Sequence, residues 1–120
     1  MCKLALLDKG KYVAEIKLNH IRNITEQAMK ARNIERIILF GSSIEERCTK
    51  ESDIDIAVFG EKNKGNYIDS KEFNAFKSAL FKFDWDQDYD VIYFSLNSKN
   101  QAAIMNDINK GVEIYRRSAV

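Results

Sequence analysis

The stretch Gly41-Ser42, followed by Ser52-Asp53-Ile54-Asp55-Ile56-Ala57-Val58, decides the fold and the chemistry of this sequence. Successive side chains of a strand alternate between its two faces, so Asp53 and Asp55 are expected on one face and the intervening apolar residues on the other. Two neighbouring carboxylates repel each other, which is costly unless a cation lies between them. Oxygen ligands on a rigid strand suit Mg²⁺, which binds through a few carboxylates together with substrate phosphates.

A third carboxylate would complete such a site, both as a metal ligand and as the acceptor for the proton of a nucleophile. Asp90 opens a predicted strand and is the best candidate, with Asp88 as the alternative. Two metal ions held in this way stabilise the attacking and leaving oxygens of an in-line displacement at phosphorus. The predicted metal ligands and catalytic residues are therefore Asp53, Asp55 and Asp90.

The Gly41-Ser42 turn is expected to bind the phosphates of a nucleoside triphosphate. Glycine lets the backbone approach a ligand closely, and a helix start offers unpaired N–H groups. Ser42 and Ser43 each have a glutamate three residues later, so either predicts the cap of a short helix. Arg47 is the nearest cation. The candidate triphosphate-binding residues are Gly41, Ser42, Ser43 and Arg47.

Around this stretch, helices and strands are expected to alternate along a chain of 120 residues without proline. The expected elements are a helix over Tyr12–Arg32, strands over Arg36–Phe40 and Ile54–Phe59, an exposed loop over Lys62–Ile68, a helix from Asp69 to Phe83, a strand over Asp90–Phe94, a helix from Ser98 to Gly111, and a short edge strand over Val112–Tyr115. This order predicts one α/β domain spanning residues 1–120, with a small mixed sheet flanked by helices.

Composition excludes several other classes of protein. The formal net charge is +1, from 19 basic and 18 acidic residues mixed along the chain. Nucleic-acid binding is disfavoured, because the nearest approach to a basic patch is Arg116-Arg117, which is expected to be solvated surface. Cys2 and Cys48 lack the spacing of a metal site, and there is no secretory signal or membrane-spanning stretch. A reducing, cytoplasmic environment fits best.

Four residues invite a functional role but are better explained by packing. His20, the only histidine, lies on the apolar stripe of the first helix. Trp85 and Tyr89 could stack on a base, yet core or rim packing is the stronger interpretation. Cys48 has no base paired with it in the sequence, so it is not expected to be a nucleophile.

The order of these motifs resembles the signature of polymerase β-type nucleotidyltransferases over almost the whole chain, including the closing Gly111–Tyr115. In its short length, the chain is similar to the minimal nucleotidyltransferases encoded beside a HEPN-domain protein. The resemblance implies a polymerase β-like fold, a triphosphate held by the Gly-Ser turn, and Mg²⁺ held by three acidic residues. It also implies AMP transfer from ATP to a hydroxyl of the HEPN partner, in a toxin–antitoxin pair. The matched positions are Gly41, Ser42, Asp53, Asp55 and Asp90.

The chain departs from the family pattern in the loop after Gly-Ser. Family members often carry arginines and a glycine there, whereas this loop carries Glu45 and Glu46, with Arg47 as its only cation. Acidic side chains facing a triphosphate would oppose binding. Two alternatives therefore stay open: an antibiotic-type enzyme that modifies small molecules, and a catalytically silent module that masks a partner.

A chain of this size has no acceptor-binding domain of its own, so a partner chain or a dimer is expected to supply one. The aromatic residues are too many for one small core, and some should form an interaction surface. The residues predicted to form this surface are Phe73, Phe76, Phe83, Val112, Ile114 and Tyr115.

Overall fold

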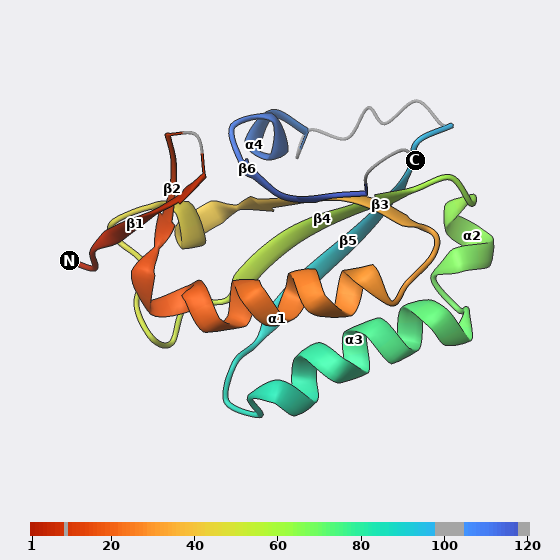
Figure 1. The fold of residues 1–120 in the computed structure, drawn as a ribbon, viewed down its shortest axis with the longest axis horizontal. Helices are drawn as coiled ribbons and strands as arrows, with labels where there is room; N and C mark the ends of the chain where they lie inside the picture. Colours follow the sequence, from red (N-terminus) through yellow and green to blue (C-terminus); the bar gives the residue numbers. More distant parts are fainter. Residues whose placement is uncertain (9, 98–104, 118–120) are drawn as a thin grey trace.

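The computed structural model describes residues 1–8, 10–97 and 105–117, and its centre is a four-stranded sheet of order β5-β4-β3-β6 (Figure 1). The strands are β3 (Ile34–Phe40), β4 (Ile54–Gly60), β5 (Tyr89–Ser95) and β6 (Val112–Arg116). β3 is antiparallel to β4 and β6, whereas β4 and β5 are parallel. The sheet is therefore mixed, as the sequence predicts, and β5 and β6 are its two edges.

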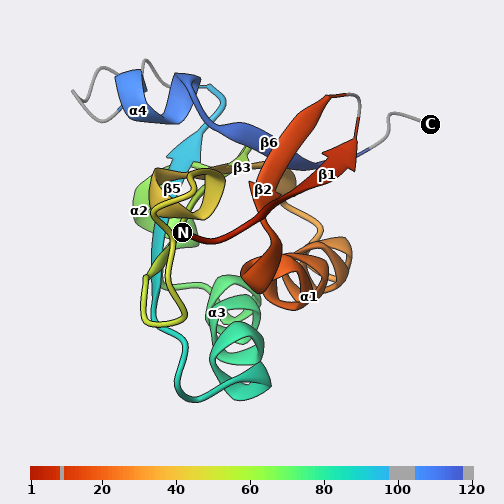
Figure 2. The ribbon, with the colours of Figure 1, turned by 90° about the vertical axis from the view of Figure 1, so that its left-hand side faces the viewer.

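Helices cover the two faces of this sheet unequally. α1 (Leu18–Met29) and α3 (Lys71–Phe83) lie side by side on one face, and α4 (Met105–Asn109) lies on the other (Figures 1 and 2). The larger core forms between α1, α3 and the sheet residues Ile54, Ile56 and Val58, which are all fully buried. A smaller core packs Ile108 of α4 against the opposite face.

The predicted interaction surface is largely wrong. Phe73 and Phe76 are only 2% and 3% exposed, because they face the core from α3. The tail residues Val112, Ile114 and Tyr115 are partly buried and pack against the same core. Of the predicted set, Phe83 remains well exposed. The three-residue spacing of Phe73 and Phe76 already placed both on one helix face, and that face is the buried one.

The first helix begins later than the sequence predicts, because residues 11–14 belong to a hairpin. β1 (Leu4–Asp8) pairs antiparallel with β2 (Lys11–Ala14), and Gly10 adopts a φ of 79° between them. A 3₁₀ turn, η1 (Glu15–Lys17), then leads into α1. The apolar spacing that includes Val13 continues the helical pattern only by coincidence, since Val13 is buried from the strand.

Local capping explains the next difference. The segment 62–68 is not entirely loop: α2 (Lys64–Tyr67) forms one turn, capped by Asn63, whose Oδ1 accepts from the N–H of Asn66 at 2.9 Å. α3 begins after Ser70 and not at Asp69, because Ser70 Oγ accepts from the N–H of Phe73. These caps satisfy helix N–H groups that would otherwise lack partners.

The C-terminal arginines also differ from expectation. Arg117 is not solvated surface: its guanidinium donates to the carbonyls of Ala28 and Ala31 at the end of α1 and of Ile34 in β3. Arg116 is exposed and pairs with Glu113.

The predicted edge strand is confirmed as β6. Ser98, Gln101 and Ile104, predicted at the start of the last helix, lie outside the described residues.

Candidate active site

Three strand ends meet at one corner of the sheet. β3 ends at Phe40, which pairs with Asp55 at the beginning of β4, and Asp55 is in turn the register partner of Asp90 on β5. Gly41 follows Phe40 directly, and Asp53 precedes β4. Since Ile54, Ile56 and Val58 fill the core on the α1–α3 side, Asp55 lies on the opposite, α4 side. Gly41, Asp55 and Asp90 are thereby brought together, with Asp53 beside them.

The Asp55 carboxyl lies in an environment that disfavours its charged form. Burial raises its pKa, and the charges of Asp90 and Asp53 raise it further, while Arg47 acts in the opposite direction. Asp53 and Asp90 are exposed, whereas Asp55 is half-buried. The electrostatic coupling shows that the three carboxylates share one local environment, in which an added cation would relieve their mutual repulsion.

The carboxylates nevertheless do not surround a single point. Within residues 1–8, 10–97 and 105–117, no three His, Cys, Asp or Glu side chains form a ready-made metal site. Two of these side chains, Asp53 and Asp90, are exposed and can turn in solvent. The backbone places Asp55 and Asp90 as neighbours, so the donor set fits a hard divalent cation once rotamers adjust.

Gly41 lies directly against the Asp55 carboxylate. Its φ of 70° is in the left-handed region, and a Cβ at this position would collide with the side chain of Asp55. Both constraints require glycine. Gly41 begins a 3₁₀ helix, η2 (Gly41–Ile44), at the position where the sequence predicts a short helix. Neither Ser42 nor Ser43 caps it. Because Gly41 has no side chain, the backbone lies directly beside the Asp55 carboxylate.

Of the two predicted phosphate-binding serines, only Ser42 reaches solvent. Ser43 is fully buried, and its Oγ has no hydrogen-bond partner among the described residues. Its hydroxyl is therefore not presented to a ligand in this conformation. Ser42 is partly exposed beside Gly41. The geometry favours Gly41 and Ser42 over Ser43 for phosphate contact.

A cavity of about 360 Å³ opens at this corner. Its lining residues are Phe40, Gly41, Ile44, Glu45, Arg47, Asp55, Asp107 and Lys110. Arg47 donates to Glu45 Oε1 at 3.0 Å, so the acidic loop, which carries Glu45 and Glu46, also contains a counter-charge. Lys110, which follows α4, adds a second cation that sequence reasoning missed. Nothing in its local sequence distinguishes Lys110 from an ordinary surface lysine.

The acidic loop is held from the N-terminal hairpin. The N–H of Cys2 donates to the carbonyl of Glu46 at 2.9 Å. Glu45 lines the cavity, whereas Glu46 does not. Only one of the two glutamates is therefore close to the proposed triphosphate, and Arg47 already pairs with it.

A buried lysine supports the segment that carries Asp53. Lys17 is 1% exposed, and its Nζ donates to the carbonyls of Ser52 at 2.8 Å and Lys50 at 3.2 Å, and to Gln87 Oε1 at 2.5 Å. Burial lowers the pKa of Lys17, although the charges of Cys48, Asp53 and other acidic neighbours raise it. Lys17 thus ties the approach to β4 to the approach to β5. Sequence reasoning missed it, because it lies within a pattern that resembles a surface helix.

The remaining candidates lie where packing explains them. His20 Nε2 is 2.8 Å from Asp84 Oδ2, and its ring meets Phe83 edge-on. Burial raises the pKa of the Cys48 thiol, which opposes a nucleophilic role. Trp85 is exposed and stacks edge-on against Phe81, while Tyr89 is half-buried behind α3.

Comparison with known proteins identifies the family. The family model described as "Polymerase beta, Nucleotidyltransferase" matches residues 22–119, and the chain therefore belongs to this nucleotidyltransferase family. No curated protein matched the sequence.

Two solved structures share the fold. One is a protein from Sulfolobus solfataricus named as a presumed nucleotidyltransferase, with a TM-score of 0.55 and 17% identity over 86% of both chains. The other is a mutant of the toxin–antitoxin pair MntA-HpeT, with a TM-score of 0.58 and 19% identity over 81% of this chain and 73% of that one. At these identities the likeness establishes the polymerase β-like fold. None of the helices described in the structure is long and apolar enough to cross a membrane.

Proposed function

We propose that this protein transfers AMP from ATP to a hydroxyl group of a HEPN-domain partner protein, as the antitoxin of a toxin–antitoxin pair in the cytoplasm. The observation that carries the proposal is the Asp55–Asp90 register pair beside Gly41, in which Asp55 lines a cavity together with Arg47 and Lys110. Carboxylates for a divalent cation and cations for a triphosphate are the two requirements of phosphoryl chemistry. Family membership supports the reaction class.

In this proposal the triphosphate occupies the corner cavity. The backbone at Gly41 and the hydroxyl of Ser42 contact the phosphates, and Arg47 and Lys110 offset their negative charge. Asp53, Asp55 and Asp90 would hold Mg²⁺, which supplies Lewis-acid stabilisation of the phosphate oxygens when bound. The residue set fits such a cation, because the repulsion that raises the pKa of Asp55 falls when positive charge is added.

The chemical step is an in-line displacement at the α-phosphorus. The acceptor oxygen forms a new P–O bond, the bond to the bridging oxygen of the β-phosphate breaks, and pyrophosphate leaves. Asp90 is exposed at the edge strand and accepts the proton of the attacking hydroxyl. Asp55, half-buried beneath Gly41, is held in place and serves as the fixed ligand.

The toxin–antitoxin assignment draws on one solved relative. The MntA-HpeT structure is of a mutant in which two aspartates, two positions apart, are replaced by glutamate. Asp53 and Asp55 have the same spacing. We infer that these aspartates have the corresponding role and that the partner here is also a toxin.

The test is to incubate the protein with ATP, Mg²⁺ and the HEPN-domain protein encoded beside it, and to weigh both proteins. We expect the partner to gain adenylyl groups with the wild type and not with Asp53→Asn. Asp69→Asn is the matched control, because Asp69 is an exposed carboxylate on the loop before α3. A partner that binds tightly but gains no mass would favour the silent binding module. Adenylylation of small hydroxyl compounds instead would favour the antibiotic-type enzyme.

A further inference from the structure

The outer edge of β5 is a strand edge next to the candidate catalytic carboxylate. Among the described strands, β5 pairs with β4 alone. The carbonyl of Asp88 accepts from the N–H of Ile54 at 3.0 Å. Parallel pairing uses alternate residues, so the N–H and C=O groups of Tyr89 and Val91 are directed away from β4. An edge of this kind is a template for another strand.

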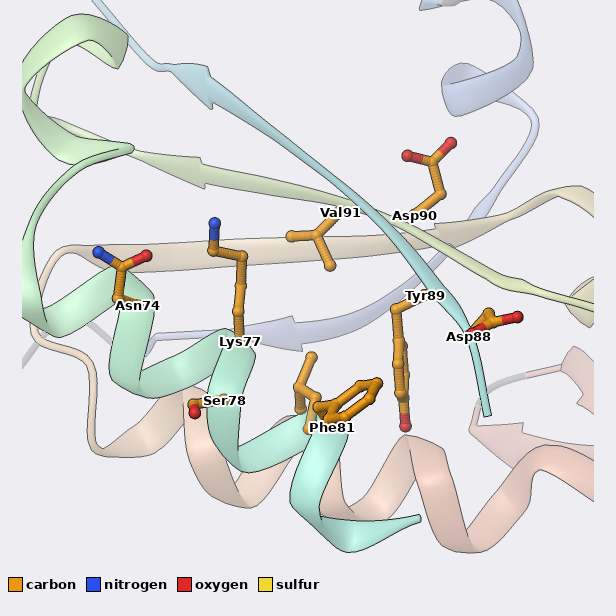
Figure 3. Close-up of a pocket in the computed structure, with 9 residues that line it drawn as sticks. Asn74, Lys77, Ser78, Phe81, Asp88, Tyr89, Asp90 and Val91 are labelled. Carbon is orange, nitrogen blue, oxygen red and sulfur yellow. The ribbon is translucent and has the colours of Figure 1, made fainter. Parts of the chain in front are cut away.

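A groove of about 730 Å³ runs between this edge and α3. Its lining residues are Asn74, Lys77, Ser78, Leu80, Phe81, Asp88, Tyr89, Asp90 and Val91. In Figure 3 the side chains of Tyr89 and Val91 point toward α3, whereas Asp90 points to the opposite side of the sheet. The edge therefore separates a groove on one face from a catalytic carboxylate on the other.

The groove is distinct from the cavity assigned to the triphosphate. The two share no lining residue, and the corner cavity lies on the α4 side around Gly41 and Asp55. They approach each other only across the β5 edge, where Asp90 borders the groove and pairs in register with Asp55. The groove is thus available to the second substrate while the triphosphate is bound.

Exposed aromatic and acidic side chains surround the groove. Phe81 is 45% exposed and Trp85 is 64% exposed, and their ring centroids are 4.7 Å apart. Asp86 and Asp88 are exposed on the approach to β5, and neither forms an ion pair with any described residue. An exposed aromatic pair marks an interaction surface, and the unpaired carboxylates favour a basic partner.

We propose that the acceptor protein docks by adding an extended, basic segment to the edge of β5. This proposal rests on the proposed function. Side chains of an added strand alternate between its faces. One side chain enters the groove against Phe81 and Tyr89, and its neighbour projects to the other face, beside Asp90. That neighbour carries the hydroxyl that accepts AMP, so strand register selects the modified residue.

Two substitutions test the docking and one serves as a control. Val91→Pro removes an outward N–H that an added strand needs, and a proline is tolerated at a strand edge. Phe81→Ser removes the exposed ring in the groove. Phe83→Ser is the matched control, because Phe83 is 50% exposed on the same helix but does not line the groove.

We expect Val91→Pro and Phe81→Ser each to raise the KM for the acceptor protein at least tenfold, with the KM for ATP and kcat nearly unchanged. Phe83→Ser should behave like the wild type. As a measurement independent of catalysis, hydrogen exchange on the Asp53→Asn variant bound to the acceptor protein should show protection of the amides of Tyr89 and Val91. Raised salt should weaken binding of the acceptor.

The outcomes separate the two proposals. Transfer with an unchanged acceptor KM in Val91→Pro and Phe81→Ser would overturn the docking mode and leave AMP transfer standing. Protection of the β5 amides in Asp53→Asn, together with no transfer by the wild type, would overturn the proposed function and support the edge as a binding surface. Neither transfer nor protection would overturn both.

Discussion

Replacing Lys17 by Met tests whether the buried lysine supports the active-site corner. The substitution keeps the length and apolar stem of the side chain and removes the ammonium with its three hydrogen bonds to Ser52, Lys50 and Gln87. Ser52 keeps a second donor, because Gln87 Nε2 donates to its carbonyl at 3.0 Å. The variant therefore leaves two acceptors without this donor, the carbonyl of Lys50 on the approach to β4 and Oε1 of Gln87 on the approach to β5.

The magnitude follows from opposing terms. Hydrogen bonds from a charged donor contribute about 1.5–3 kcal/mol each, so three contribute roughly 4.5–9 kcal/mol. Burying an ammonium costs several kcal/mol, which offsets about half of this gain. The expected loss of unfolding free energy is about 2–4 kcal/mol. For a domain of this size, about 4 °C accompanies each kcal/mol, so the melting temperature should fall by roughly 8–16 °C.

The assay is thermal and urea unfolding of Lys17→Met, with Lys50→Met as the control. Lys50 is exposed on the same segment, and only its backbone carbonyl takes part in the bonds, so its replacement should change stability by about 0.5 kcal/mol or less. Transfer activity of Lys17→Met, measured where it is fully folded, should fall roughly tenfold because Asp53 loses its support. A loss below about 0.5 kcal/mol would refute the reasoning.

The pH dependence of stability gives an independent check on the direction in which the pKa of Lys17 is shifted. Burial lowers the pKa of Lys17 below its ordinary value of 10.5, so the unfolded chain binds this proton more tightly than the folded one. Stability from this group therefore rises as pH increases through the folded pKa toward the unfolded value. Wild type and Lys17→Met should diverge over that alkaline range. Convergence would mean that the charges of the acidic neighbours, and not burial, dominate the pKa of Lys17.

Three further substitutions test other contacts. Gly41→Ala should cost about 1–3 kcal/mol of stability because its φ is positive, and should reduce transfer roughly a hundredfold by displacing Asp55; wild-type kinetics would contradict this. Asp55→Asn should melt at or slightly above the wild type at neutral pH without metal, by up to about 1 kcal/mol. Burial and neighbouring charges raise the pKa of Asp55, so the difference should vanish as pH falls below the ordinary value of 3.8; a melting temperature several degrees lower would oppose it. Arg117→Met should lose about 1–3 kcal/mol on thermal unfolding, whereas the exposed Arg116→Met should lose about 0.5 kcal/mol; equal losses would refute the capping role.

Local sequence patterns predicted the sheet well and the N-terminus poorly. The strands containing Ile37 and Ile56 are short apolar runs next to a glycine, and their identity follows from length and β-branched composition. The first hairpin was missed because Val13 and Ile16 happen to continue the spacing of α1. Gly10, with its positive φ, was the available turn signal. Periodicity alone cannot distinguish a short strand that runs directly into a helix.

The candidate site divides along the same line. Asp53 and Asp55 are two positions apart in the sequence, so their spacing alone predicted a common environment. Lys17 and Lys110 reach the same corner from distant parts of the chain, and only tertiary packing brings them there. Lys17 donates to backbone carbonyls, which requires no particular residue types around it, so no motif marks it.

Strand direction explains why the corner exists. Antiparallel pairing brings the end of β3 beside the beginning of β4, and parallel pairing brings the beginning of β5 to the same place. The Gly41-Ser42 turn and the carboxylates then meet without any long loop reaching across the sheet. A slip of one residue in β4 would exchange Asp55 with a core isoleucine, so the buried residues of β4 hold the site in register.

The connection between β3 and β4 leaves this corner and returns to it, and it needs support from elsewhere. That support comes from the N-terminal segment: Cys2 holds Glu46, and Lys17 holds Lys50 and Ser52. Both residues lie before residue 22, where the match to the family begins. The range matched by the family thus contains the carboxylates and the glycine turn, whereas the loop beside the corner cavity is held by residues that lie outside that range. Glu45 and Glu46, where the chain departs from the family pattern, lie in the segment that Cys2 and Lys17 hold in place.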